Sequence, residues 1–358
     1  MPAGQGYKHT EHENRFLPRD VEIPCSWKQI RTVDMHTAGE PLRIVLDGFP
    51  DLGGGSVLEL RRCAKERFDR WRMRLMWEPR GHADMYGCLI LPPAEKDGDF
   101  SVLFMHNAGW STMCGHGIIA VSIAALSTGL VDMDRATGGL HIDTPAGRVV
   151  AYATVDSDGG GTARFLNVPS FAAALDQSIV VPGLGRVAYD LAFGGAFYAY
   201  VDAASIGLTC DPAHVGRLVV AGKAIKEAIV RERTIEHPAE DDLGFLYGTI
   251  FTAEAGNVQH HSRHVCIFAD GEVDRSPTGT GVSGRLAILH SRGELGAGQP
   301  CVIESILGTT FTGRIASETT CGPHQAVVPE VTGTAHITGV HTFVFDPHDP
   351  LADGFLLA

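Results

Sequence analysis

One cysteine of this 358-residue chain lies where its thiol could do chemistry. Cys114 belongs to the sequence Met-Cys-Gly-His-Gly (113–117), which runs directly into the apolar segment 118–126. That segment predicts a helix, and a thiol at a helix N-terminus has a lowered pKa, which supplies thiolate near neutral pH. A thiolate can act as a nucleophile or as a base, so Cys114 is the first candidate catalytic residue. A buried structural cysteine is the alternative, and the Gly-His-Gly context favours the catalytic interpretation.

His116 follows Cys114 by two residues and has more than one possible role. It could be a base partner for the thiol or a hydrogen-bond donor to a substrate, and a helix-capping or packing role is the alternative. No other histidine or acid lies at metal-ligand spacing around it, so we expect no metal site.

A second Gly-rich turn lies 164 residues further along the chain (278 − 114 = 164). The sequence Asp-Arg-Ser-Pro-Thr-Gly-Thr-Gly (274–281) precedes the apolar segment 282–290, and Thr278 occupies the position of Cys114. A hydroxyl group with an ordinary pKa is a poor acid or base near neutral pH, although it can hydrogen-bond or fill space. Asp274 could bind a substrate ammonium group, or it could simply form the turn.

The two turns are part of an internal repeat. Four pairs of matching segments follow one another in the same order, at offsets of 161, 164, 164 and 161 residues. They are marked by Tyr86 and Tyr247, Phe104 and Phe268, Cys114 and Thr278, and Ile142 and Ile303. A nearly constant offset predicts a duplicated α/β domain. The expected units are a first half (30–165), a second half (166–335), an N-terminal extension (1–29) and a C-terminal segment (336–358) that returns to the first half.

Short strands and a few helices must position the two turns. Strands are predicted at 42–46, 88–91, 102–105 and 149–155. Helices are predicted at 58–73, 118–126, 217–230 and 282–290. The duplication would bring the two Gly-rich turns together at an interface, where backbone N–H groups and helix dipoles favour an anion. A bound carboxylate would then be held from both sides, with residues 114 and 278 on opposite faces of the ligand.

The composition narrows the class of function. With 29 Lys and Arg against 42 Asp and Glu, the formal net charge is −13, so we expect no nucleic-acid binding. No apolar run reaches the length of a membrane helix, and the polar start of the chain, 1–20, is neither a secretory signal nor a transit peptide. Eight cysteines without CxxC spacing predict reduced thiols in the cytoplasm. The expected partner is a small molecule.

The motifs resemble those of the proline racemase family over almost the whole chain. The resemblance includes the segments 34–41, 78–82, 113–117 and 274–281, and it extends to about residue 351. It implies a diaminopimelate-epimerase-like fold of two similar α/β (α+β) domains, with the active site between them and no metal or pyridoxal cofactor. The family is often dimeric, so a homodimer is possible.

The resemblance also implies roles for individual residues. Proline racemases and 4-hydroxyproline epimerases use two cysteines, and the second would fall at position 278, where this chain has Thr. A Cys–Thr pair resembles that of the trans-3-hydroxy-L-proline dehydratases. By this resemblance Cys114 is the base, Thr278 faces it, and the substrate is held by Gly115, His116, Asp274, Gly279 and Thr280. No role follows for His36, His82 or Asp84 in the two polar segments 34–41 and 78–87.

A single thiol is sufficient for a reaction that finishes on one face of the ring. The hypothesis is that Cys114 removes the Cα proton and then returns it to the departing 3-hydroxyl group, which gives Δ1-pyrroline-2-carboxylate. One alternative is a 4-hydroxyproline 2-epimerase or proline racemase, against which Thr278 argues. Another is an inactive imino-acid-binding relative. A third is a thiol hydrolase that uses Cys114 with His116, for which two-residue spacing on a turn is unfavourable.

Overall fold

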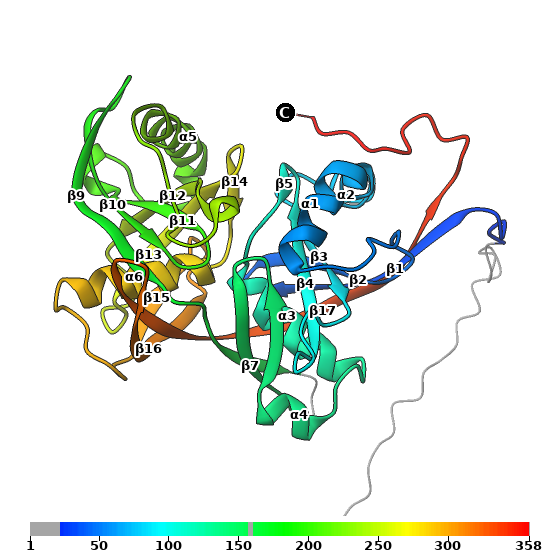
Figure 1. The fold of residues 1–358 in the computed structure, drawn as a ribbon. Helices are drawn as coiled ribbons and strands as arrows, with labels where there is room; N and C mark the ends of the chain where they lie inside the picture. Colours follow the sequence, from blue (N-terminus) through cyan, green and yellow to red (C-terminus); the bar gives the residue numbers. More distant parts are fainter. Residues whose placement is uncertain (1–21, 157–159, 358) are drawn as a thin grey trace, which may run out of the picture.

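Each half of the chain forms a β-sheet around a buried central helix, so the protein has an α+β structure. This computed structural model describes residues 22–156 and 160–357, and most of the expected N-terminal extension, including the polar start at 1–20, lies outside the described residues. Within those two ranges, no helix is long and apolar enough to cross a membrane. The strands form one hydrogen-bonded network, in which β17 (His324–Phe345) passes from one half to the other (Figure 1).

Strands and helices follow one another in a similar order in the two halves. The first half contains β1 (Lys28–Thr37), β2 (Glu40–Asp47), α1 (Val57–Arg67), α2 (Asp69–Met76), β3 (Tyr86–Leu91), β4 (Phe100–His106), β5 (Gly109–Trp110), α3 (Gly115–Ser127), α4 (Met133–Gly138), β6 (Leu140–Thr144), β7 (Gly147–Val155) and β8 (Gly161–Leu166). The second half contains β9 (Phe171–Val181), β10 (Gly185–Phe193), β11 (Phe197–Asp202), α5 (Val215–Glu232), β12 (Leu246–Ala253), β13 (Ser262–Phe268), β14 (Glu272–Asp274), α6 (Gly279–Ser291), β15 (Cys301–Glu304) and β16 (Thr310–Cys321). Short 3-10 helices lie at Ala204–Ile206, Pro212–His214 and Asp241–Leu243.

The hydrogen-bond pattern of the sheets repeats. In the first half, β2 pairs parallel with β3, β3 antiparallel with β4, β4 parallel with β6, and β6 antiparallel with β7. In the second half, β11, β12, β13, β15 and β16 pair in the same order and with the same directions. The register differs by two residues, since Phe100 lies opposite Ile142, whereas Ser262, and not His264 at the offset of 164, lies opposite Ile303. The expected fold of two pseudo-symmetric halves is therefore confirmed.

β17 belongs to both halves. Its first part, from His324 to Thr332, pairs with β16, and its last part, from Ala335 to Phe345, pairs with β1. Between these parts, Gly333 and its neighbours pair with β8. One strand thus connects the two sheets, while the domain boundaries given above stay a prediction.

The single helix predicted at 58–73 is wrong, because the chain forms two helices there. At Phe68 the backbone leaves the helical region (φ −127°, ψ 10°), and α2 starts at Asp69. The Asp69 carboxylate accepts hydrogen bonds from Arg72 at 2.7 Å and from the Trp110 indole at 2.9 Å. The bond from Trp110 anchors the new helix to β5, a contact that local helix periodicity does not reveal.

The central helices α3 and α6 meet at their N-termini. Each begins three residues before the segment predicted for it, so the Gly-rich turns form the first helical turns, directly after Cys114 and Thr278. A Cβ atom on Gly115 would lie 2.5 Å from the Gly279 Cα atom, and one on Gly279 would lie 2.6 Å from the Gly115 Cα atom. Contacts this short are not tolerated, so glycine is required at both positions.

Replacing Gly279 with Ala should destabilise the protein, because the new methyl group has no room at this junction. Overpacking of this kind costs about 1–3 kcal/mol, which urea denaturation would detect as a lower free energy of unfolding. Gly216→Ala in α5 is the matched control, since a Cβ there meets no atom within 4 Å and alanine favours the helix. Equal losses of stability in both variants would contradict the close-contact account.

Candidate active site

All seven residues that the sequence assigned to the site line one small pocket. They are Cys114, Gly115 and His116 from the first half and Asp274, Thr278, Gly279 and Thr280 from the second. The cavity volume of the pocket is only about 20 Å³, far below the usual range for drug-sized ligands, so its ligand must be small.

The Cys114 thiol contacts both its own helix and His116. Its sulfur accepts the N–H of Gly117 at 3.3 Å and lies 3.1 Å from His116 Nδ1. Only 5% of Cys114 and 3% of His116 are exposed, so the contact is shielded from water. The expectation that two-residue spacing disfavours such a pair is wrong, because the extended backbone of Cys114 (φ −144°) turns its side chain over the first helical turn. Thiol and imidazole are close enough to exchange a proton.

Burial sets the protonation state of Cys114. Removal from water raises the pKa of the thiol well above its ordinary value, and the N–H of Gly117 opposes this only in part. The carboxyl groups of Asp274 and Glu40 raise the thiol pKa further. The predicted lowering of the thiol pKa by the helix N-terminus is therefore wrong. Burial also lowers the pKa of His116, so the thiol and the imidazole are both neutral near pH 7.

Thr278 matches Cys114 in the repeat but differs from it in backbone conformation. Its φ is +66°, a region that β-branched residues seldom adopt, so the surroundings must hold it there. The Thr278 hydroxyl donates to Asp274 Oδ2 at 2.8 Å, and the Ser276 N–H donates to Asp274 Oδ1 at 2.7 Å. Both carboxylate oxygens of Asp274 thus stabilise the turn that carries Thr278.

Three tyrosines also line the pocket, although no role was predicted for any of them from the sequence. The hydroxyl groups of Tyr86 and Tyr247 lie 3.3 Å apart, and the Tyr198 hydroxyl lies 2.8 Å from Thr280 Oγ1. Burial raises the pKa of all three phenols well above the ordinary value, so they are neutral hydrogen-bonding groups. The offset of 161 residues between Tyr86 and Tyr247 was the available signal.

The residues left without a role have different positions. His36 and His82 do not line the pocket: the His36 ring lies 5.1 Å from the ring of His336 on β17, and His82 is exposed. Asp84 contacts the second half, because its carbonyl oxygen accepts a hydrogen bond from the Arg275 guanidinium at 2.7 Å. Asp84 therefore stabilises the turn that carries the site residues without lining the pocket.

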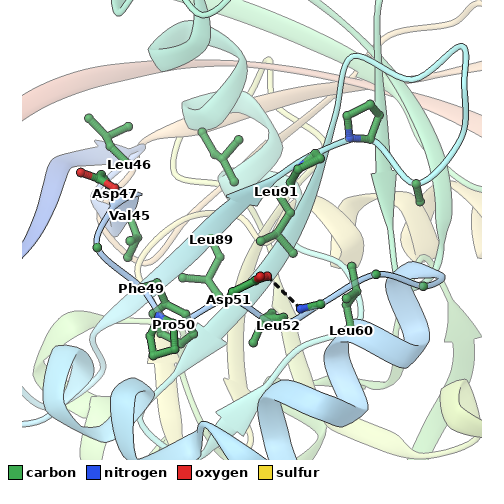
Figure 2. Close-up of a pocket in the computed structure, with 18 residues that line it drawn as sticks. Val45, Leu46, Asp47, Phe49, Pro50, Asp51, Leu52, Leu60, Leu89 and Leu91 are labelled. Atoms are coloured by element: carbon green, nitrogen blue, oxygen red, sulfur yellow. Dashed lines mark hydrogen bonds between the residues drawn. The ribbon is translucent and has the colours of Figure 1, made fainter.

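A wider hollow lies on the surface of the first half (Figure 2). It is lined by residues 45–55 and 89–94 and by Leu60, and its cavity volume is about 420 Å³. Its ionisable side chains are those of Asp47 and Asp51, and no thiol, imidazole or cation lines it. It therefore lacks the combination of groups that makes the smaller pocket a candidate active site.

The raised pKa of Cys114 predicts that its thiol reacts slowly with alkylating reagents near neutral pH when no ligand is bound. Because the thiolate is the reactive form, alkylation of Cys114 should accelerate with pH, with a midpoint above the value of about 8.5 of an ordinary thiol. Peptide mass spectrometry after iodoacetamide treatment at several pH values would measure this, with the exposed Cys25 as an internal check on the reagent. A midpoint below pH 7 would instead support control by the helix N-terminus.

Comparisons with known proteins agree on one family. The family model described as proline racemase matches residues 32–356. The chain is 45% identical to a trans-3-hydroxy-L-proline dehydratase from Colwellia psychrerythraea, over 93% of this chain and 94% of that protein. It is 44% identical to a 3-hydroxyproline 2-epimerase from Burkholderia multivorans, over 92% and 98% of the two chains. The crystal structure of a hydroxyproline epimerase from Agrobacterium vitis, with bound trans-4-hydroxy-L-proline, matches with a TM-score of 0.86 at 31% identity, over 92% and 96% of the two chains. This chain therefore belongs to the proline racemase family.

Proposed function

We propose that this protein is a cofactor-independent dehydratase of trans-3-hydroxy-L-proline. The observation that carries the proposal is Thr278, which stands where a second thiol would face Cys114 across the contact of α3 with α6. Racemisation needs a base on one face of the substrate and an acid on the other, and an ordinary hydroxyl group is a poor acid. The dehydratase name of a relative 45% identical to this chain supports the same choice.

The stereochemistry of the substrate suits a reaction on one face. In trans-3-hydroxy-L-proline, the 3-hydroxyl group lies on the same ring face as the Cα hydrogen. The Cys114 thiolate removes the Cα proton, the C–H electrons form the Cα–Cβ double bond, and the C3–O bond breaks. The new thiol gives its proton to the leaving oxygen, so water departs and the thiolate is restored. The enamine then tautomerises to Δ1-pyrroline-2-carboxylate without a further residue.

The pocket supplies the charges that this reaction needs. His116 Nδ1, at 3.1 Å from the sulfur, can take the thiol proton and leave a thiolate beside an imidazolium. Backbone N–H groups at Gly115 and His116 of α3, and at Gly279 and Thr280 of α6, hold the substrate carboxylate and stabilise the charge that develops when the Cα proton leaves. Asp274 pairs with the ring nitrogen, whose positive charge favours the thiolate in turn.

2-Epimerisation is the second candidate function, because the pocket contains another thiol. Cys266 lines the pocket wall and is fully buried. A relative that is 44% identical to this chain carries an epimerase name. Cys266 comes from β13, however, and not from the turn that matches Cys114, so dehydration is the preferred function.

We also propose a cytoplasmic location and a homodimer. All eight cysteines lie in the described residues and are free thiols, which supports a reducing compartment. The homodimer rests on the family resemblance alone.

Cys114→Ser should abolish dehydration while the protein stays folded. A serine hydroxyl is a far weaker base than a thiolate, so kcat/KM should fall by a factor of at least about 10²–10⁴. The assay is a panel of 3- and 4-hydroxyproline isomers, with the pyrroline product measured after reaction with an aldehyde reagent. Cys25→Ser is the control, because Cys25 is exposed and outside the pocket. Near-normal dehydration by Cys114→Ser would overturn the mechanism, and no product from any isomer in the wild type would favour an inactive binding protein.

Thr278→Cys should introduce epimerase activity, because it places a thiol on the second face. Chiral chromatography of proline, 3-hydroxyproline and 4-hydroxyproline reactions should show the C2 epimer with Thr278→Cys and none with the wild type. Cys266→Ala is the companion variant, since it tests the other thiol of the wall. If the wild type makes the epimer and Cys266→Ala does not, epimerisation by Cys114 and Cys266 replaces the dehydratase proposal.

A further inference from the structure

The turn between β1 and β2 lies between the two Gly-rich turns of the site. Thr37 Oγ1 donates a hydrogen bond to the carbonyl oxygen of His116 at 3.0 Å. Glu40 Oε2 accepts the backbone N–H of Arg275 at 2.7 Å, and the Arg275 guanidinium lies 3.4 Å from the same oxygen. A turn of the first half thus contacts both the start of α3 and the chain that follows Asp274.

The segment that Glu40 contacts is built from short local hydrogen bonds. The Ser276 N–H and the Thr278 hydroxyl both donate to the Asp274 carboxylate, and the Thr278 N–H donates to Ser276 Oγ at 3.1 Å. These bonds fix the shape of the segment, but they do not fix its position relative to Cys114. Contacts with the first half must set that position. The hydrogen bond from Arg275 N–H to Glu40 is such a contact, and it holds the backbone of the segment directly.

We propose that Glu40 is a positioning residue for the active site, which holds Asp274 and Thr278 at their working distance from Cys114 by accepting the N–H of Arg275. The substrate in this inference is that of the proposed function. Glu40 does not line the pocket, so it acts through the turn and not on the substrate.

The surroundings of the Glu40 side chain indicate which of its properties the turn requires. The side chain is fully buried, and Oε1 has no hydrogen-bond partner within residues 22–156 and 160–357. Burial first, and then the neighbouring Asp274 carboxylate, raise the pKa of Glu40 well above its ordinary value, while Arg275 opposes this only in part. Both effects favour the protonated form of the Glu40 carboxyl group. Its contribution is an acceptor oxygen at a fixed reach, which a glutamine amide would also provide.

Two substitutions separate reach from acidity. Glu40→Gln keeps the length and the acceptor oxygen and loses the acid, whereas Glu40→Asp keeps the acid and loses one methylene of reach. With Glu40→Asp we expect a KM at least about tenfold higher and a lower kcat, since a displacement of about 1 Å can cost up to about 10²-fold. With Glu40→Gln both constants should stay within about threefold of the wild type.

Glu304→Gln is the matched control for a buried carboxyl group. Glu304 is 3% exposed, and hydrogen bonds from Gly256 N–H, Asn257 N–H and the Arg263 guanidinium overcome its burial and bring its pKa to about 2. It lies outside the pocket, so its replacement should lower the melting temperature and leave kcat and KM unchanged.

Three outcomes would overturn the role of Glu40. Normal constants for Glu40→Asp would show that reach is unimportant. Equal damage from Glu40→Gln and Glu40→Asp would show that an ionised Glu40 is needed. A similar rise in KM and fall in kcat in Glu304→Gln would show that the changes come from a general loss of stability.

Binding is also measured without turnover, as protection of Cys114 from iodoacetamide by L-proline. That protection should weaken in Glu40→Asp even if the wild type shows no dehydratase activity, so failure of the proposed function would be recognised separately.

Discussion

The contact between the Gly115 and Gly279 backbones is the constraint on which the rest of the site depends. Two helix N-termini meet there with no room for a side chain, and they present N–H groups from both halves to the same small volume. The residue before each glycine then flanks that volume, which is why Cys114 and Thr278 line one pocket although 164 residues separate them. The repeated strand pairing places α3 and α6 for this contact, and β17 keeps the two sheets in one network.

Burial decides the chemistry that this geometry permits. In a pocket shielded from water, neutral forms of thiol, phenol and imidazole are favoured, and hydrogen bonds to a developing charge are stronger than in water. The Cys114 thiol, the His116 imidazole and the tyrosine hydroxyl groups are all in this situation. The pair of thiol and imidazole provides a base only when a proton moves between them. In the proposed mechanism, a cationic substrate paired with Asp274 would therefore help to create the base that attacks it.

Much of the site could be predicted from the sequence because the internal repeat consists of short, recognisable motifs. Cys114 and Thr278 were matched by their position before similar apolar helices, and this match depends only on local sequence. The direction in which the pKa of the Cys114 thiol is shifted could not be predicted, since it depends on how completely distant segments bury Cys114. Glu40 was missed for a similar reason: its partner, Arg275, is 235 residues away in sequence. The division of the helix at Phe68 also depends on a distant contact, that of Asp69 with Trp110.

The course of β17 has a consequence for how the chain is made. β1 leaves the ribosome long before its pairing partner on β17, which includes residues 335–345. β1 does pair with β2, but its other edge has no partner until β17 has been synthesised. Such long-range pairing slows folding and leaves a strand edge open to other chains in the meantime. The sheet of the first half is therefore completed only after the second half has been synthesised.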